Sequence, residues 1–458
     1  MQAVQLAALA EAPAGVAAAM DTVSGFDAAL VNGLARVSEP QSAALAALAG
    51  AMAGSPLAET VAAAVSKVST GAIGTDELSA LAAARAALLG AVHDALLDQA
   101  DTAMGRNRSE WTATPDAAAP NPLAAGSRAW LGELAIAGWR GVDHDLVAAA
   151  DRTVETLLAE PALRRLATLL DGFTAELGAC VPIATMDRVP ARRWADLWTR
   201  ALLLSWRGAE SAADEPVSGR LLPLGVDVHE HGTAVQAQVH AVLEAAGAPT
   251  RLVRVSVAAA KVDTIVGPAV WQLLSTHQQL LTALAERRVL ELTEMPLTAT
   301  GDLLWDDDRA KAGEAADPFV TATVQLPKAQ AAAVAPLDRD PVHIAEPVLL
   351  EGYRFRDGVL ELGEQRIRVE VDALPSAGPL TPAGVTGSAT MIGLLRWETC
   401  GWSVRPLAVQ RKVKSALTAF HNGDWALGPT DPKVAKAQAK SGDAVAVLRE
   451  RAGRLLRK

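Results

Sequence analysis

The chain has 458 residues, of which 50% are hydrophobic and 21% are charged, and it carries a net charge of −10. This composition excludes an intrinsically disordered protein, and the length is enough for about three domains of average size. Only two cysteines are present, Cys180 and Cys400, which excludes a disulfide framework and a metal site built from thiolates alone, so we expect a cytoplasmic location.

We predict no targeting segment at the N-terminus and no membrane span in the longest uncharged run. No basic residue precedes the first apolar stretch, so we expect no secretory signal peptide. Residues 40–58 are uncharged and long enough to cross a membrane, but Gly50, Gly54 and Pro56 interrupt a sequence that is mainly alanine. We therefore expect a buried helical hairpin there and no membrane span.

The charge is unevenly distributed along the chain. From Arg405 to the C-terminus there are twelve basic and four acidic residues, which leaves this segment at +8 and the preceding residues at −18. A polarised molecule of this kind can bind nucleic acid, an anionic membrane surface or an acidic partner through its basic end.

Residues 1–206 show only helical periodicity and are rich in alanine, the best helix former. One helix is predicted to begin at Thr75 and to stop at Gly105, since glycine commonly follows a helix. The last helix of this part places Trp194 and Trp198 on one side, which favours a core anchor over a platform for a ligand. We expect an all-α, alanine-rich N-terminal domain.

The periodicity changes after residues 207–219, a polar segment that we interpret as a domain boundary. In residues 220–243 apolar and polar side chains alternate, and a turn at His231-Gly232 or Gly232-Thr233 predicts a β-hairpin. One face of this hairpin carries Val226, Val228, Val235, Ala237 and Val239, and the other carries Asp227, His229, Gln236 and Gln238.

The rest of the central part alternates between strand and helix patterns. We predict strands at residues 252–257, 289–292 and 319–326, and a helix at residues 268–287 that has His277 on its apolar side. This order indicates an α+β domain over residues 220–326, with an antiparallel or mixed sheet.

A proline-containing segment, residues 327–341, is interpreted as a second linker, and two tight turns follow it. Asp357-Gly358 and Gly363-Glu364 predict three antiparallel strands with consistent faces. The expected cross-strand pairs are Phe355 with Leu360, Arg354 with Glu361, Leu360 with Ile367, and Glu361 with Arg366. Strands near residues 391–397 and 402–409 complete a small antiparallel β domain, residues 341–410, and a basic helical tail, residues 411–458, ends the chain.

Common catalytic signatures are absent from the sequence. It has no glycine-rich loop that ends in Lys-Ser or Lys-Thr, no strand-linked G-x-G-x-x-G, no G-x-S-x-G and no H-E-x-x-H. Their absence argues against the common NTPases, Rossmann enzymes, α/β-hydrolases and zincins. An enzyme with dispersed catalytic residues stays open.

Asp227, His229 and His231 form the best candidate metal site. At i, i+2 and i+4 on an extended strand they project from one face, and two imidazoles with one carboxylate suit a divalent transition metal. His240 on the partner strand is a further candidate ligand. A plain polar face is the simpler interpretation, because His231 belongs to the turn and no evident hydrogen-bond partner for the imidazoles lies nearby in the sequence.

The basic tail is the second candidate for function. Its cations lie along one helical side and near the end of the chain, namely Lys433, Lys436, Lys440, Arg451, Arg454 and Arg457. Such residues bind phosphate backbones without sequence preference, but no aromatic residues are interleaved for base stacking. Contact with an acidic partner, or a solvated terminal helix, is favoured.

These features favour a non-catalytic cytoplasmic interaction protein, a subunit or adaptor of a larger assembly with a protein partner. Two alternatives come from other classes. One is a metal-dependent enzyme that uses the face of Asp227, His229 and His231, and the other is a protein that binds nucleic acid through the tail.

Overall fold

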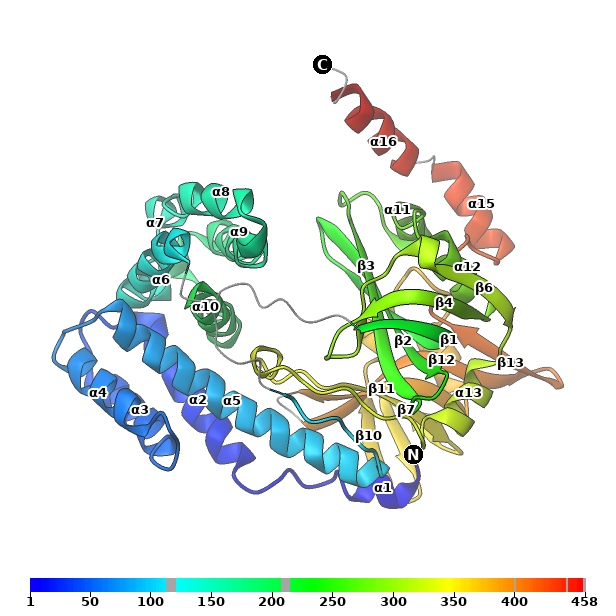
Figure 1. The fold of residues 1–458 in the computed structure, drawn as a ribbon, viewed down its shortest axis with the longest axis horizontal. Coiled ribbons are helices and arrows are strands. Elements are labelled where there is room, and N and C mark those ends of the chain that lie inside the picture. Colours follow the sequence, from blue (N-terminus) through cyan, green and yellow to red (C-terminus); the bar gives the residue numbers. More distant parts are fainter. Residues whose placement is uncertain (113–120, 207–214, 399–400, 442–443, 456–458) are drawn as a thin grey trace.

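The computed structural model of the chain describes residues 1–112, 121–206, 215–398, 401–441 and 444–455. Helices fill the N-terminal part, and mixed sheets fill the central and C-terminal parts (Figure 1). The two parts lie side by side and meet at the N-terminal helix and at the C-terminal end of the longest helix. The expected change from helices to strands is confirmed at this level.

The helical domain, residues 1–206, consists of ten α-helices within the described residues. These are α1 (Ala3–Ala7), α2 (Val16–Asn32), α3 (Glu39–Ala51), α4 (Ala58–Ser69), α5 (Thr75–Met104), α6 (Ala125–Ala137), α7 (His144–Ala148), α8 (Asp151–Ala159), α9 (Arg164–Cys180) and α10 (Ala191–Trp206). The uncharged run at residues 40–58 falls within α3 and the turn before α4, so it forms part of a helical hairpin as expected.

The predicted bounds of α5 and the predicted core position of Trp194 and Trp198 are confirmed. Helix α5 begins at Thr75, although Gly74 takes the N-cap position, and it ends at Gly105, whose φ of +63° is the left-handed conformation that favours glycine. On α10 the side chains of Trp194 and Trp198 are fully buried, and Trp198 Nε1 donates a hydrogen bond to the carbonyl of Leu131 at 2.9 Å. Both tryptophans are therefore core residues.

Helix α5 is long and apolar enough to span a membrane by length and composition. It is the one such helix among the described residues, and 61% of its most apolar stretch is buried inside the protein. A core helix of a folded domain has the same properties.

The first sheet closes into a small barrel. Its strands are β1 (Glu215–Glu230), β2 (Ala234–Ala245), β3 (Arg251–Ala260), β4 (Arg288–Leu297), β5 (Asp302–Leu303) and β6 (Ala310–Ala315), in the order β1-β2-β3-β5-β4-β6, with β4 also paired to β1. The predicted hairpin is β1 and β2, and its turn contains a hydrogen bond from the His231 N–H to the Ala234 carbonyl. The five apolar residues predicted for one face lie in the barrel core.

Three helices flank the barrel: α11 (Val270–Leu273), α12 (Gln278–Glu286) and α13 (Pro318–Gln325). The helix predicted at residues 268–287 is broken before α12, where His277 takes the N-cap position. The strand predicted at residues 319–326 is wrong, because this segment is α13. The Asp317 side chain accepts the N–H of Phe319, and burial of Phe319 and Ala322 on one side stabilises the helix.

The second sheet contains the predicted meander. Its strands are β7 (Ala345–Glu351), β8 (Arg354–Arg356), β9 (Val359–Leu362), β10 (Gln365–Val369), β11 (Thr390–Glu398), β12 (Gly401–Val413) and β13 (Ala416–His421), and α14 (Pro382–Thr386) lies between β10 and β11. All four predicted cross-strand pairs are present in β8, β9 and β10. The sheet is mixed rather than antiparallel, since β10 pairs with β12 in parallel. Residues 390–398 and 401–413 are strands, as expected.

The two sheets share a hydrophobic core. Leu222 and Val242 on the outer face of the barrel pack with Ile392, Leu394 and Leu407 of the second sheet, and α13 covers the same core. On the far side of the second sheet, α1 and the end of α5 contribute to another core. The sheets are thus fixed to each other, and the helical domain is anchored on the second sheet.

The prediction of a helical tail over residues 411–458 is wrong for its first part, because residues 411–413 end β12 and β13 follows as its antiparallel partner. Only the later part is helical, as α15 (Pro432–Ser441) and α16 (Ala444–Leu455). The side chains of Val434, Val445 and Leu448 pack against the barrel core beside α11, and Val445 is 2% exposed. Arg449 donates from Nη2 to the Gln272 carbonyl at 2.7 Å. The tail is therefore docked on the barrel through its apolar side.

Candidate functional site

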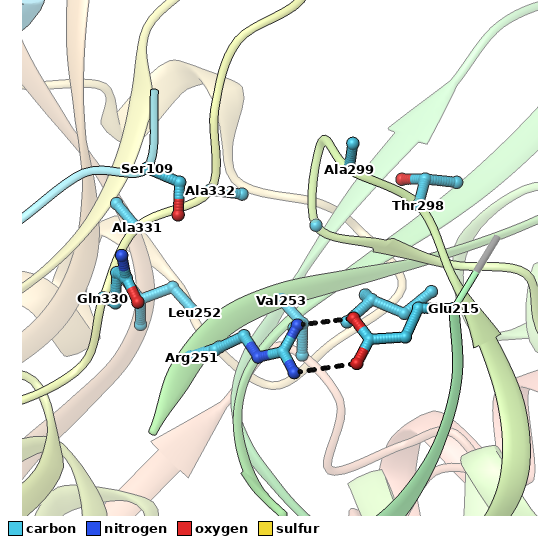
Figure 2. Close-up of a pocket in the computed structure, with 12 residues that line it drawn as sticks. Ser109, Glu215, Arg251, Leu252, Val253, Thr298, Ala299, Gln330, Ala331 and Ala332 are labelled. Carbon is cyan, nitrogen blue, oxygen red and sulfur yellow. Dashed lines mark hydrogen bonds and ion pairs between the residues drawn. The ribbon is translucent and has the colours of Figure 1, made fainter. Parts of the chain in front are cut away.

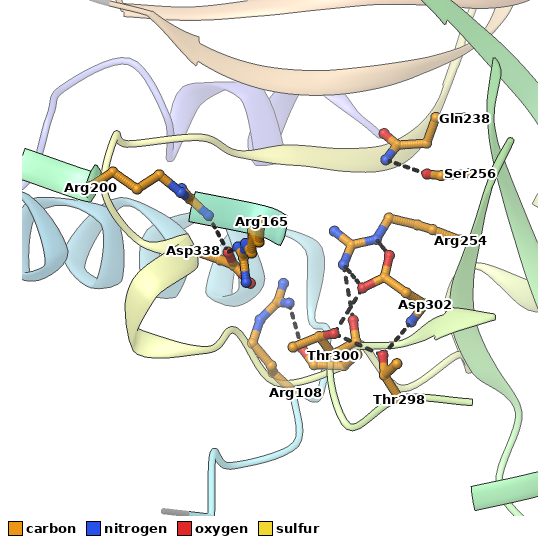
Figure 3. Close-up of polar contacts among 11 residues, drawn as sticks. Arg108, Arg165, Arg200, Gln238, Arg254, Ser256, Thr298, Thr300, Asp302 and Asp338 are labelled. Carbon is orange, nitrogen blue, oxygen red and sulfur yellow. Dashed lines mark hydrogen bonds and ion pairs between the residues drawn. The ribbon is translucent and has the colours of Figure 1, made fainter. Parts of the chain in front are cut away.

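A cavity of about 400 Å³ lies between the helical domain and the barrel. Its walls come from α5, α10, β2, β3, the turn before β5, and the segment of residues 331–347 that leads into β7. Figure 3 shows polar side chains from α10, β2, β3, the turn before β5 and the segment of residues 331–347. A hollow of this size at a domain boundary is of the kind that holds small ligands.

The barrel supplies one wall through neighbouring residues of β2 and β3. His240 pairs with Arg254 across the two strands, and Gln238 pairs with Ser256 on the same face. His240 is 1% exposed, and its Nε2 has no hydrogen-bond partner among the described residues. Burial, with the charge of Arg254, lowers the pKa of His240 to about 4, so the imidazole is neutral at pH 7.

Arg254 is held in place by the turn before β5. Its Nε and Nη2 bind Asp302 Oδ1 and Oδ2 at 3.0 and 2.9 Å, and Nη2 also donates to the Thr300 carbonyl. The Thr300 hydroxyl donates to Asp302 Oδ2 at 2.8 Å, and the Asp302 N–H binds Thr298 Oγ1 (Figure 3). A bidentate pair with this support fixes the guanidinium plane.

The opposite wall contains a second group of ion pairs. Arg108 donates to Asp101 at 2.6 Å from Nε and to Glu346 at 2.9 Å from Nη2, and Arg106 reaches Glu346 at 2.6 Å. Burial disfavours ionisation of Glu346, but Arg108 and Arg106 outweigh it and lower the pKa of Glu346 to about 2. These contacts tie the end of α5 to the start of β7.

The segment that the sequence suggested as a linker carries the remaining contacts. Asp338 accepts hydrogen bonds from Arg200 of α10 at 2.8 Å and from Arg165 of α9 at 3.3 Å. Arg339 donates to Asp94 of α5 at 2.6 Å. Residues 327–344 therefore form an ion-paired strap: Gln330 pairs with Arg251 of β3 on the barrel, and residues 334–344 lie against the helical domain.

A smaller hollow of about 180 Å³ adjoins the cavity on the barrel side (Figure 2). Arg251 and Glu215 face each other at its edge with an N–O distance of 3.1 Å. Across both hollows each arginine faces a carboxylate, so neither charge is in excess. The Gln238 amide lines the cavity, and the ion pairs of Arg108 with Glu346 and of Arg200 with Asp338 join the helical domain to the segment that leads into β7.

The predicted metal ligands are only partly brought together. His229 Nε2 lies 3.2 Å from Asp227 Oδ2, but His231 is in the turn, where its Nδ1 lies 3.2 Å from Thr233 Oγ1. Within the described residues no group of three or more His, Cys, Asp or Glu side chains is arranged to hold a metal ion. His240 lies on the same face of the hairpin as Asp227, and it lines the cavity.

The polar face of the hairpin is partly buried rather than solvated. Asp227 is 3% exposed, and Arg405 of β12 binds its Oδ2 from Nη1 at 3.0 Å. Arg405 also donates from Nε to Glu370 at 2.9 Å, and Ser403 donates to Glu370 at 2.6 Å. Burial would raise the pKa of Asp227, but the hydrogen bond from His229 and the charge of Arg405 lower it to about 2.

Arg405 could not be assigned to Asp227 from sequence, because the two residues are far apart in the chain and meet only when the sheets pack.

The buried ion pairs of Arg85 could have been predicted from the sequence, since an arginine on the apolar side of α5 needs a buried partner. Arg85 is fully buried and pairs with Asp27 at 2.6 Å and with Asp196 at 2.7 Å.

The cations predicted for the tail lie on α15 and α16, apart from Arg457. Lys433, Lys436, Lys440, Arg451 and Arg454 are exposed, and Arg457 lies outside the described residues. Arg454 pairs with Glu450 within α16.

The comparisons with known proteins gave no relatives. No protein-family model matches the chain, and neither the curated proteins nor the solved structures give a significant match.

Proposed function

We propose that this chain is a non-catalytic interaction protein, a subunit or adaptor of a larger assembly, and that its docked basic tail binds an acidic protein partner. The observation that carries the proposal is the orientation of α15 and α16. Their apolar side chains contact the barrel, and their six described cations are exposed, namely Lys433, Lys436, Lys440, Arg449, Arg451 and Arg454.

Because the tail is docked on the barrel, its basic residues can bind a partner at a lower cost in conformational entropy. A free basic arm loses conformational entropy when it binds, whereas a helix already fixed on a core presents its charges at little further cost. The remainder of the chain, with its charge of −18, repels an anionic partner and directs it to the tail. The small number of cysteines favours a cytoplasmic setting for this assembly.

The two alternatives have less support. A metal-dependent enzyme would need Asp227 as a ligand, but this carboxylate already binds Arg405 and His229. Nucleic acid would be attracted by the same tail cations, but no aromatic residue lies in α15 or α16 to stack on bases. We therefore treat nucleic acid as an outcome of the test.

The test is capture by the tagged full-length chain at low salt, after nuclease treatment, followed by direct binding measurements with each captured protein. We expect at least one acidic protein whose affinity falls more than about tenfold when Lys433→Glu, Lys436→Glu and Lys440→Glu are combined. These three residues are exposed, so the substitutions should leave the fold intact.

The matched control reverses three exposed arginines of the helical domain that form no ion pair among the described residues, Arg36→Glu, Arg152→Glu and Arg188→Glu, which changes the net charge by the same amount. It should retain the partner. Equal loss of binding in both variants would mean that net charge alone acts. A partner that is captured only when the nuclease treatment is omitted would favour nucleic acid.

A further inference from the structure

An open groove runs along the helical domain between α9 and α10. Its volume is about 590 Å³, and it continues into a neighbouring hollow of about 640 Å³ at the start of α10. Arg200 lines both hollows and also the cavity between the helical domain and the barrel, so the groove lies beside that cavity.

The floor of the groove is apolar. Leu169 comes from α9, and Leu197 and Leu204 lie seven residues apart on one side of α10; all three are half-buried. Gly172 of α9 lines the groove, and a Cβ atom placed there would meet nothing within 4 Å. The glycine therefore leaves room for a guest side chain.

The rim of the groove is positive. Arg164, Arg165, Arg193 and Arg200 line it, and the carboxylates that approach them are Glu176 and Asp338. Arg164 pairs with no carboxylate among the described residues; its Nε donates to the Leu158 carbonyl. The rim thus has two positive charges in excess.

We propose that the groove between α9 and α10 binds an acidic amphipathic helix of a partner protein. An apolar floor between two helices, with leucines seven apart, matches the contacts of a guest helix that presents apolar residues at i, i+4 and i+7. Excess arginine at the rim selects carboxylates beside that stripe. Phe173 is the one aromatic residue of the lining and is fully buried, so a nucleobase would find no ring to stack on.

The probe is a fluorescent helical peptide with a leucine stripe flanked by glutamates, compared with a peptide of the same stripe flanked by lysines. The wild-type chain should bind the glutamate peptide more than about tenfold tighter, by fluorescence anisotropy. Equal affinity, or preference for lysine, overturns the proposal.

Two variants locate the binding. Gly172→Trp should fill the groove and abolish binding, whereas Gly50→Trp, at an exposed glycine of α3 that also has open space at its Cβ, should not. Arg164→Glu with Arg165→Glu should reverse the preference toward the lysine peptide. Unchanged binding in Gly172→Trp contradicts the assignment to this groove.

The groove is a different surface from the basic tail, and the two can be tested apart. The variant with Lys433, Lys436 and Lys440 reversed should still bind the glutamate peptide. Loss of peptide binding in this variant would place the peptide on the tail and overturn the present proposal. A single-stranded oligonucleotide that competes with the peptide for the wild type, but no longer binds Gly172→Trp, would also overturn it, in favour of nucleic acid.

Discussion

Asp340, in the strap between the two sheets, places its Oδ1 3.7 Å from Nη1 of Arg85, a side chain with no solvent exposure inside the helical domain. Asp27 and Asp196 bind the same guanidinium. One arginine of α5 therefore joins two helices of its own domain to the strap that leads into the second sheet.

Asp340 should make stability depend on pH. Burial raises its pKa to about 6, against the opposing charge of Arg85. Because the folded protein holds this proton more tightly than the unfolded chain, the free energy of unfolding should fall as pH rises from about 4 to 6 and level off above. The loss is at most about 3 kcal/mol. Asp340→Asn removes the titrating group and should not show it.

Urea unfolding of both proteins between pH 4 and 7 checks this prediction. The difference between them isolates Asp340 from Asp227 and Glu346, whose low pKa values act at lower pH. A difference that stays constant over this range would show that Asp340 titrates normally.

Removing Arg85 should be strongly destabilising. Arg85→Met removes the ion-pair partner of the buried Asp27 and Asp340, and it leaves Asp196 paired with Arg192 alone. Loss of one partner from a buried ion pair costs roughly 3 to 5 kcal/mol. Arg165→Ala, which breaks an exposed pair with Asp338, should cost less than about 1 kcal/mol. Similar melting temperatures for the two variants would contradict the buried network.

The pair of Asp227 and Arg405 should stabilise the contact between the sheets. The pKa of Asp227 is lowered to about 2, so its contribution is present above pH 4 and is lost as pH falls toward 2. Asp227→Asn should therefore lower the free energy of unfolding at pH 7 by about 2 kcal/mol, with a smaller effect near pH 2. His229→Ala, at a side chain that is 43% exposed, should cost far less.

Zinc should not stabilise the protein. Asp227 already accepts hydrogen bonds from Arg405 and His229, and His231 lies in the turn. A ligand that binds only the folded state raises the melting temperature. We expect no rise with a tenfold excess of Zn²⁺ for the wild type, and the same result for His229→Ala. A rise in the wild type alone would restore the metal hypothesis.

Local patterns predicted the parts of the fold that depend on neighbours in sequence. The meander registers followed from Asp357-Gly358 and alternating side chains, and the core face of β1 and β2 followed from alternating valines. The error at α13 shows the limit of this approach. Its β-branched residues resemble a strand, but Val320 and Val324 are exposed, and the Asp317 cap with the buried Phe319 determines the helix.

The site depends on contacts between distant segments. Asp227 and His229 were identified, but their burial depends on Arg405 of the second sheet. The strap resembled a linker because prolines and alanines dominate it, and its charged residues acquire partners only when α5 and α10 lie beside it. Pairings of this kind are not encoded in the periodicity of either segment.

The most direct test of the central claim is the salt dependence of partner binding. For the acidic protein captured by the full chain, the logarithm of the association constant should fall steeply with the logarithm of salt concentration, because the tail cations contribute electrostatic attraction that salt screens. The Lys433→Glu, Lys436→Glu, Lys440→Glu variant should bind weakly, with little remaining salt dependence. The same slope and affinity in the wild type and this variant would contradict recognition through the basic tail.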